Sequence, residues 1–186
     1  NPTFFIENQV VGNVNTHHDL DPEEVAATII RHVTDGIVLA KKHRLPRRLH
    51  DFILEHHGTL ITLYQYTQAM EAAGGDVSKV DIENFRYPGP RPHSRETALL
   101  MLADATEARA RAERPANEDE LRTLVHKVID TVQKYDQLDD TLLTLRDLNL
   151  ITESFVTTLR GQNHPRIQYP NAKAADPDFT IPAPRK

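Results

Sequence analysis

The sequence predicts an all-α protein, and three observations support that prediction. Apolar residues recur three and four positions apart along several segments, which is the spacing of the buried face of a helix. Helix-starting residues stand before most of these segments. The alternation of apolar and polar residues that is typical of β-strands is scarce. We therefore expect several amphipathic helices around one core.

The first helix is expected to run from Asp21 to about His43. Asp21 is a favourable N-cap residue and Pro22 suits the first turn. Glu23 and Glu24 follow near the positive end of the helix dipole. The apolar stripe of this helix consists of Val25, Ile29, Val33 and Ile37.

Pro46 opens the second predicted helix, which carries the pair His56-His57. The buried stripe of this helix is expected to consist of Leu45, Leu49, Phe52 and Ile53. Gly58 should break or bend the helix before an apolar segment over residues 60–70. The glycine pair at 74–75 ends that segment.

Residues 76–93 are predicted to form a loop, because the stretch 86–92 is too rich in proline for regular structure. Ser94 then caps a third helix, which should extend through Arg111.

A capping box formed by Asn117 and Glu120 predicts the start of a fourth helix, which should end near Tyr135. Its apolar stripe consists of Leu121, Leu124, Val128 and Val132. A fifth helix is expected over about residues 145–160, with its end at Gly161.

The composition is that of an ordinary globular chain. It has 186 residues, 39% of them hydrophobic and 26% charged, and a mean hydropathy of −0.52, which fits one domain. No apolar run approaches the ~18 residues of a membrane span, and no signal peptide is recognisable. The lack of cysteine excludes a disulfide scaffold and fits a reducing compartment. The net charge of −5 argues against a nucleic-acid polymer as partner.

Polar side chains occupy four positions that helical periodicity assigns to the interior. His56 and His57 follow the stripe of the second helix, and His32 continues that of the first. Asp104 interrupts the stripe of the third, which consists of Leu100, Met101, Ala105 and Ala108. Burying a polar group without partners costs roughly 2–7 kcal/mol. A divalent cation held by these side chains would offset that cost.

Imidazole and carboxylate ligands suit zinc, iron, manganese or nickel. Neighbouring helix residues diverge by about 100°, which suits two cis ligands of one octahedral ion or ligands of two ions in a cluster. The alternative for each histidine is an ordinary core residue whose ring bonds a backbone carbonyl. Four other histidines lie among charged or polar residues and are expected to be solvated: His43, His50, His93 and His126.

Six local strings of the chain carry a resemblance to a known family: Phe4-Phe5-Ile6-Glu7-Asn8-Gln9, Ile30-Arg31-His32-Val33, Glu55-His56-His57-Gly58, Phe85-Arg86-Tyr87-Pro88-Gly89-Pro90, Met101-Leu102-Ala103-Asp104 and His164-Pro165-Arg166-Ile167. They are similar to the cytosolic HD domain of the seven-transmembrane HD proteins, the PgpH-type phosphodiesterases that hydrolyse cyclic di-AMP. They occur in the family's order. The resemblance implies an HD-superfamily helical domain over residues 1–170, followed by an extended Pro-rich tail over 171–186.

The resemblance also implies metal ligands. His32, His56 and His57 match three metal-ligand histidines of the family, and Asp104 matches its late aspartate ligand. The family's paired His-Asp signature normally precedes the string at 4–9, and the chain begins too late to contain it. We therefore expect the chain to be the C-terminal portion of an HD domain, and to be inactive in isolation.

The resemblance implies that an intact site would hold two divalent ions, iron or manganese, which would supply a hydroxide for opening cyclic di-AMP to linear pApA. The three histidines would hold one ion, and the aspartate would contribute to the other. Arg86, Tyr87 and Arg166 are expected to contact the substrate. A purely structural role, with the guanidinium bonded to carbonyls, is the alternative for each arginine.

Two other functions stay open. HD phosphohydrolases can act on a different nucleotide, such as a nucleoside triphosphate or cyclic di-GMP, and a domain that has lost catalysis would be a nucleotide-sensing module. The resemblance further implies the cytoplasmic domain of a multi-pass membrane protein, attached through an N-terminal region that this chain lacks. Homo-oligomerisation is left open.

Overall fold

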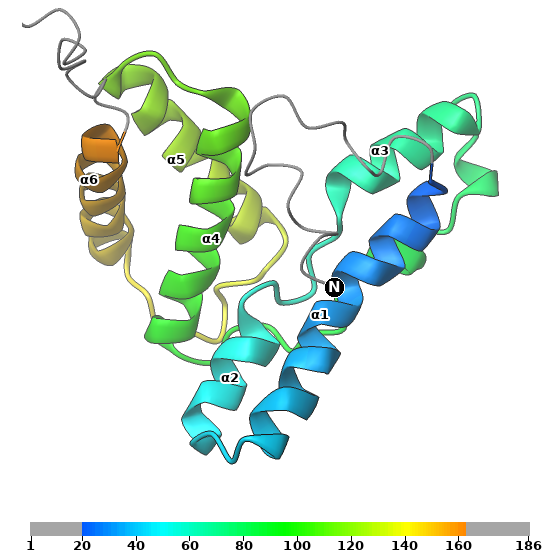
Figure 1. Ribbon diagram of the computed structural model, residues 1–186. Helices are drawn as coiled ribbons and strands as arrows, with labels where there is room; N and C mark the ends of the chain where they lie inside the picture. Colours follow the sequence, from blue (N-terminus) through cyan, green and yellow to red (C-terminus); the bar gives the residue numbers. More distant parts are fainter. Residues whose placement is uncertain (1–19, 163–186) are drawn as a thin grey trace, which may run out of the picture.

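The computed structural model describes residues 20–162, and over this range the fold is all-α as predicted (Figure 1). Its helices, with short 3-10 helices labelled η, are α1 (Pro22–Lys42), α2 (Arg47–Glu55), α3 (Leu63–Ala72), η2 (Val77–Lys79), η3 (Ile82–Phe85), α4 (Arg95–Glu113), α5 (Glu118–Lys134) and α6 (Leu145–Gln162). None of these described helices is both long and apolar enough to cross a membrane. The predicted string at 4–9, Arg166 and the tail over 171–186 lie outside the described residues.

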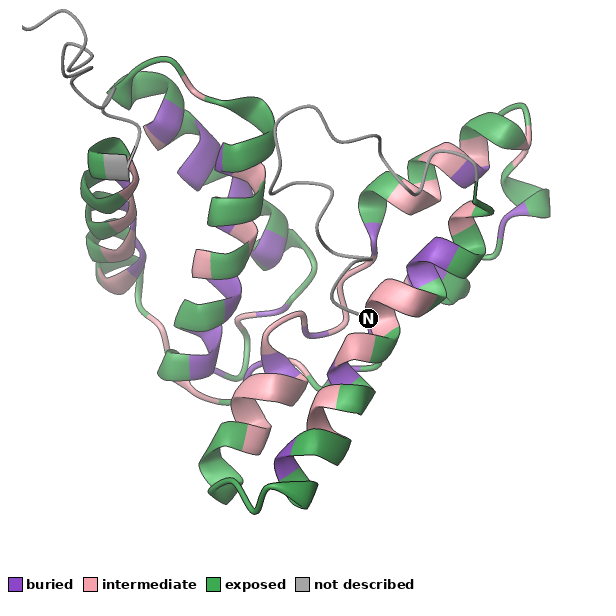
Figure 2. Ribbon diagram, in the orientation of Figure 1, coloured by how far each residue is buried: buried purple, intermediate pink, exposed green. Residues whose placement is uncertain are grey.

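The helices form two groups that meet where α2 packs against α4 (Figure 1). In one group α4, α5 and α6 pack on one another, and their facing sides hold the larger core (Figure 2). In the other group α1 packs against α2, α3 and η3. A smaller core lies here, made of Ala26, Ala69, Val80 and Phe85. The junction of the two groups brings α1, the end of α2 and α4 close together.

Capping residues explain where three of the helices begin. Asp21, Ser94 and Asn117 each accept a hydrogen bond from a backbone N–H two or three residues further on, at 2.7, 3.2 and 2.9 Å. Glu120 reaches back over the start of α5, but its carboxylate accepts from the backbone N–H of Ala116 at 2.8 Å, one residue before the N-cap. The predicted starts of α1, α4 and α5 are therefore confirmed.

Several helix ends differ from the prediction. α2 ends at Glu55, so the histidine pair lies just beyond the helix and not on it. Gly58 turns the chain there with a φ of +52°, a conformation that favours glycine. α4 continues to Glu113, and α6 passes through Gly161. The loop over 76–93 contains η2 and η3, each started by an aspartate cap.

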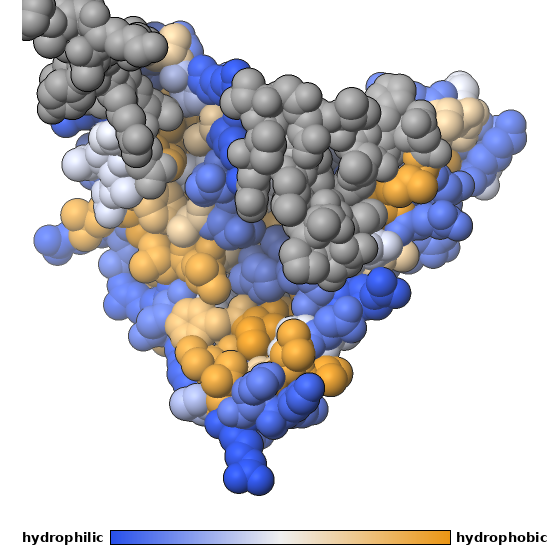
Figure 3. Space-filling model, viewed as in Figure 1, coloured by the Kyte–Doolittle hydropathy of each residue, from blue (hydrophilic) through white to orange (hydrophobic). Residues whose placement is uncertain are grey.

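The apolar stripe predicted for α2 is not buried in the described structure. Leu45 and Leu49 are 41% and 42% exposed, and Phe52 and Ile53 are half-buried. α2 packs against α1 and α4, and this leaves part of its apolar face at the surface. Apolar side chains gather over α2 and the adjoining end of α1 in the lower part of Figure 3.

The buried face of α4 is also rotated from the predicted one. Met101 and Ala105 do pack into the larger core, but Leu100 is 39% exposed. Ala98 and Leu102 are fully buried in its place. The rotation moves the position of Asp104 from the interior to the edge of the junction between the two helix groups.

Candidate metal centre

Three histidines converge where the two helix groups meet. His32 lies in the middle of α1, His56 is the C-cap residue of α2, and His57 follows it. One ring nitrogen from each lies within 4.8 Å of the other two. The predicted convergence of these residues from separate helices is present, and the three side chains could hold a metal ion.

The orientation of two of the rings is fixed by backbone carbonyls. Nδ1 of His32 lies 2.5 Å from the carbonyl oxygen of Ile29, and Nδ1 of His56 lies 2.9 Å from that of Ile53. Because a carbonyl oxygen can only accept, each Nδ1 carries the proton. Each neutral ring then presents its lone pair at Nε2, which is the tautomer that binds a metal.

The two Nε2 atoms of His32 and His56 face one another at 3.1 Å. Two lone pairs at this distance repel, and a shared cation or proton removes the repulsion. The alternative of an ordinary core histidine accounts for the Nδ1 contact of each ring, but not for the close approach of the two Nε2 atoms. A divalent cation fits this donor set.

Burial disfavours protons in the cluster. Desolvation, followed by the positive charge that His56 and His32 would carry, lowers the pKa of His57 to about 3. Desolvation and then His32 lower the pKa of His56. For His56 and His57 the neutral imidazole, which is the form that coordinates metals, is thus the favoured state near neutral pH.

Asp104 lies at the open side of this cluster. Its Oδ2 atom is 3.7 Å from Nδ1 of His57, which is beyond hydrogen-bond distance. The side chain is 47% exposed, so its assignment to the interior was wrong, although its proximity to the histidines agrees with the prediction. Desolvation raises the pKa of this carboxyl, and the neighbouring His56 opposes that shift.

The predicted substrate contacts occupy different surroundings. Tyr87 is buried, and its ring stacks on that of His57 with the centroids 4.2 Å apart. Arg86 donates to the carboxylate of Glu83 at 2.9 Å and to the carbonyl of Thr59 at 2.8 Å. Both residues thus brace the chain around the histidine pair, and their contact with a substrate stays a prediction. Arg166 lies outside the described range.

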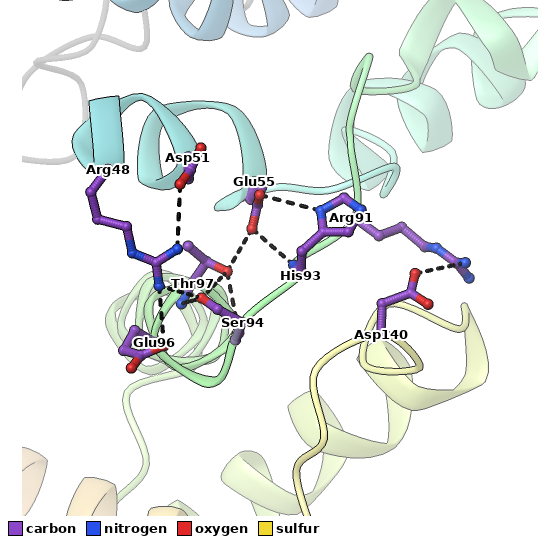
Figure 4. A network of polar contacts seen from close by, with 9 residues as sticks. All are labelled: Arg48, Asp51, Glu55, Arg91, His93, Ser94, Glu96, Thr97 and Asp140. Atoms are coloured by element: carbon purple, nitrogen blue, oxygen red, sulfur yellow. Dashed lines mark hydrogen bonds and ion pairs between the residues drawn. The ribbon is translucent and has the colours of Figure 1, made fainter. Parts of the chain in front are cut away.

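Sequence reasoning assigned no role to Glu55, the residue before the histidine pair. Its carboxylate is buried and accepts hydrogen bonds from Thr97 and from the backbone of His93, as Figure 4 shows. His93, expected to be solvated, is half-exposed and held by this carboxylate. His50 was also expected to be solvated, yet its Nε2 is buried with no hydrogen-bond partner among the described residues.

Three relatives match most of the chain. An uncharacterized protein of Synechocystis is 40% identical over 185 residues, and the cyclic-di-AMP phosphodiesterase PgpH of Bacillus subtilis is 37% identical over 172 residues. PgpH of Listeria monocytogenes is 32% identical over 172 residues. These matches cover 98%, 92% and 92% of the chain but only 22%, 23% and 23% of the relatives. No family model matches the chain.

Two solved structures of the L. monocytogenes PgpH HD domain share the fold. The domain in complex with cyclic-di-AMP superposes with a TM-score of 0.74 at 29% identity, over 83% of this chain and 71% of that one. The second structure of this domain gives a TM-score of 0.76 at 28% identity, over 88% and 74%. The chain is homologous to the PgpH HD domain. The HD-superfamily helical fold and the family expected from the six strings are thereby confirmed.

Proposed function

We propose that the chain belongs to a metal-dependent phosphodiesterase that hydrolyses cyclic di-AMP to linear pApA. The convergence of His32, His56 and His57 at the junction of the two helix groups carries this proposal. Its support from relatives is the homology to PgpH, whose HD domain has been crystallised with cyclic-di-AMP. Because the chain spans less than a quarter of the length of those relatives, the activity is proposed for the longer protein.

The histidines of the cluster would hold a metal ion through defined atoms. His32 and His56 offer Nε2, because their Nδ1 atoms are held by carbonyls. The stacked ring of Tyr87 restricts the orientation of His57. When bound, divalent ions lower the pKa of a coordinated water and stabilise charge on phosphoryl oxygens. Asp104, half-exposed beside His57, lies on the side of the cluster that is open to solvent and therefore to a nucleotide phosphate.

Further details extend the proposal. Nitrogen and carboxylate ligands fit iron or manganese, and we propose two such ions, with Asp104 contributing to the second. Arg86, Tyr87 and Arg166 are proposed to contact the dinucleotide. We also propose that residues 1–170 form the HD portion of a cytoplasmic domain that the longer protein attaches to the membrane.

A substrate panel on the full-length protein tests the proposed function. The protein, loaded with Mn²⁺, is incubated with cyclic di-AMP, cyclic di-GMP and a nucleoside triphosphate, and products are separated by chromatography. We expect pApA from cyclic di-AMP at a rate at least about tenfold above that of the other substrates. Faster cleavage of another nucleotide would replace the proposed substrate, and turnover of none of them would favour a sensing module.

A further inference from the structure

The two adjacent histidines lie in a short turn just after α2, and two backbone hydrogen bonds close this turn. The backbone N–H of Gly58 donates to the carbonyl of Glu55 at 3.0 Å, and that of Leu60 donates to the carbonyl of His57 at 3.2 Å. The turn follows the last residue of α2, so the regular hydrogen bonds of a helix no longer restrain it. Other parts of the fold must hold the two imidazoles toward His32.

Glu55 anchors the turn on its N-terminal side. Its Oε2 accepts from the hydroxyl of Thr97 at 2.6 Å and from the backbone N–H of His93 at 2.9 Å, and its Oε1 lies 3.3 Å from Nδ1 of His93 (Figure 4). The side chain is only 8% exposed. These partners lie at the start of α4, so the carboxylate ties the end of α2 to the other helix group.

Gln137 anchors the turn on its C-terminal side. The side chain, 2% exposed, comes from the segment after α5. Its Oε1 accepts from the backbone N–H of Thr59 at 2.9 Å, and its Nε2 donates to the hydroxyl of Thr59 at 2.9 Å and to the carbonyl of Tyr135 at 2.5 Å. Both donor hydrogens and the acceptor of the amide are thus used, which fixes its orientation.

We propose that Glu55 and Gln137 are positioning residues that hold the His56-His57 turn from both sides, and thereby set the affinity of the three-histidine cluster for a divalent metal. The inference rests on the proposed metal-dependent function. The hydrogen bonds of Glu55 go to Thr97 and the backbone of His93, and those of Gln137 go to Thr59, so both residues act through the backbone that carries two of the proposed ligands. Loss of residues that orient metal ligands typically weakens affinity by about 10–100-fold.

Metal affinity of the folded chain separates positioning from a merely structural role. Co²⁺ alone is titrated into the 186-residue chain, with the visible absorption of the ion reporting its coordination and circular dichroism reporting folding. We expect Glu55→Ala and Gln137→Leu to weaken Co²⁺ binding by about 10–100-fold and to change its spectrum. Glu55→Gln keeps an acceptor for Thr97 and should retain most of the affinity.

Thr152→Ala is the matched control. Thr152 is 2% exposed, like Gln137, but its hydroxyl donates to the carbonyl of Leu148 within α6, away from the turn. This variant should lose stability and keep the wild-type affinity for Co²⁺. If Glu55→Ala or Gln137→Leu does not fold, the milder Thr97→Val and Thr59→Val remove single partners of the same anchors.

The outcomes distinguish the positioning role from the metal site itself. Folded anchor variants that bind Co²⁺ within about twofold of the wild type, with its spectrum unchanged, would overturn the positioning role and leave the proposed function intact. Equal weakening in Thr152→Ala would also overturn it, because the loss would then follow stability alone. A wild-type chain that binds no Co²⁺ would refute the histidine site, and the positioning role with it.

Discussion

Replacing Gly58 with alanine should destabilise the protein through two separate effects. The residue has a φ of +52°, and an L-residue in this left-handed region costs about 1–2 kcal/mol. A Cβ atom would also lie 2.1 Å from Oε1 of Gln137 and 2.8 Å from Cε of Met101. The methionine end can move, but the glutamine amide is buried and fully bonded, so moving it breaks its hydrogen bonds to Thr59.

The hydrogen bonds between Gln137 and Thr59 set the expected loss of unfolding free energy. Each hydrogen bond contributes about 0.5–1.5 kcal/mol, so displacing Gln137 from Thr59 should cost about 1–3 kcal/mol beyond the backbone term. Gly74→Ala isolates the backbone term, because Gly74 has a φ of +67° and nothing within 4 Å of its Cβ position. We therefore expect Gly58→Ala to be less stable than Gly74→Ala by about 1–3 kcal/mol.

Thermal and urea unfolding of the two variants measure this difference. For a chain of this size, about 1–3 kcal/mol corresponds to a Tm lower by roughly 2–12 °C. Gly58→Ala should in addition bind Co²⁺ more weakly than Gly74→Ala, since the strained turn carries His56 and His57. Equal destabilisation of the two variants would refute the argument that the packing of Gln137 against Gly58 holds the turn.

Three further outcomes are expected. Asp104→Asn should lower activity at least about tenfold but the free energy of unfolding by less than about 1 kcal/mol, because the carboxylate is half-exposed beside His57. A loss of stability large enough to account for the loss of activity would contradict this. Leu124→Ala should lower the free energy of unfolding by about 2–5 kcal/mol, because Leu124 is 2% exposed, and Leu49→Ala by less than about 1 kcal/mol, because Leu49 is 42% exposed. Urea unfolding measures both, and equal losses would show that another element covers α2. Arg86→Lys should raise KM for the dinucleotide and leave kcat unchanged, as expected of a residue that contacts the substrate. An unchanged KM together with a lower Tm would instead assign Arg86 a structural role, through its bonds to Glu83 and Thr59.

Local signals in the sequence were sufficient to predict most of the helices. The caps at Asp21, Ser94 and Asn117 and the turn at Gly58 depend on residues a few positions apart, so their chemistry can be read from the chain. The stripe of α5 is buried as predicted, because a helix packed between two others buries one continuous face.

The surroundings of α2 could not be predicted in the same way. Periodicity identifies an apolar face, but it does not indicate which element covers that face, and Leu45 and Leu49 are exposed in the described structure. The same limit applies to α4, where the choice of buried face depends on how α5 and α6 pack against it, and Asp104 lies at the edge for this reason.

The candidate site, too, could be predicted only in part. Each histidine was recognisable because a polar residue continued an apolar stripe, and the family strings added the prediction that the three are metal ligands. The anchors Glu55 and Gln137 gave no such signal. Gln137 lies 78 residues from Thr59 in the chain, and the two meet because the folded chain places the segment after α5 against the histidine turn.

The metal content of the full-length protein tests the central claim most directly. Metal bound per protein is measured by elemental analysis alongside hydrolysis of cyclic di-AMP, in the wild type, in His56→Ala and in the control His126→Ala. His126 lies exposed on α5, outside the cluster. His56→Ala should lose bound metal and at least about 100-fold in activity together, and His126→Ala should match the wild type. Wild-type metal content with full turnover in His56→Ala would contradict the assignment of the three histidines as ligands.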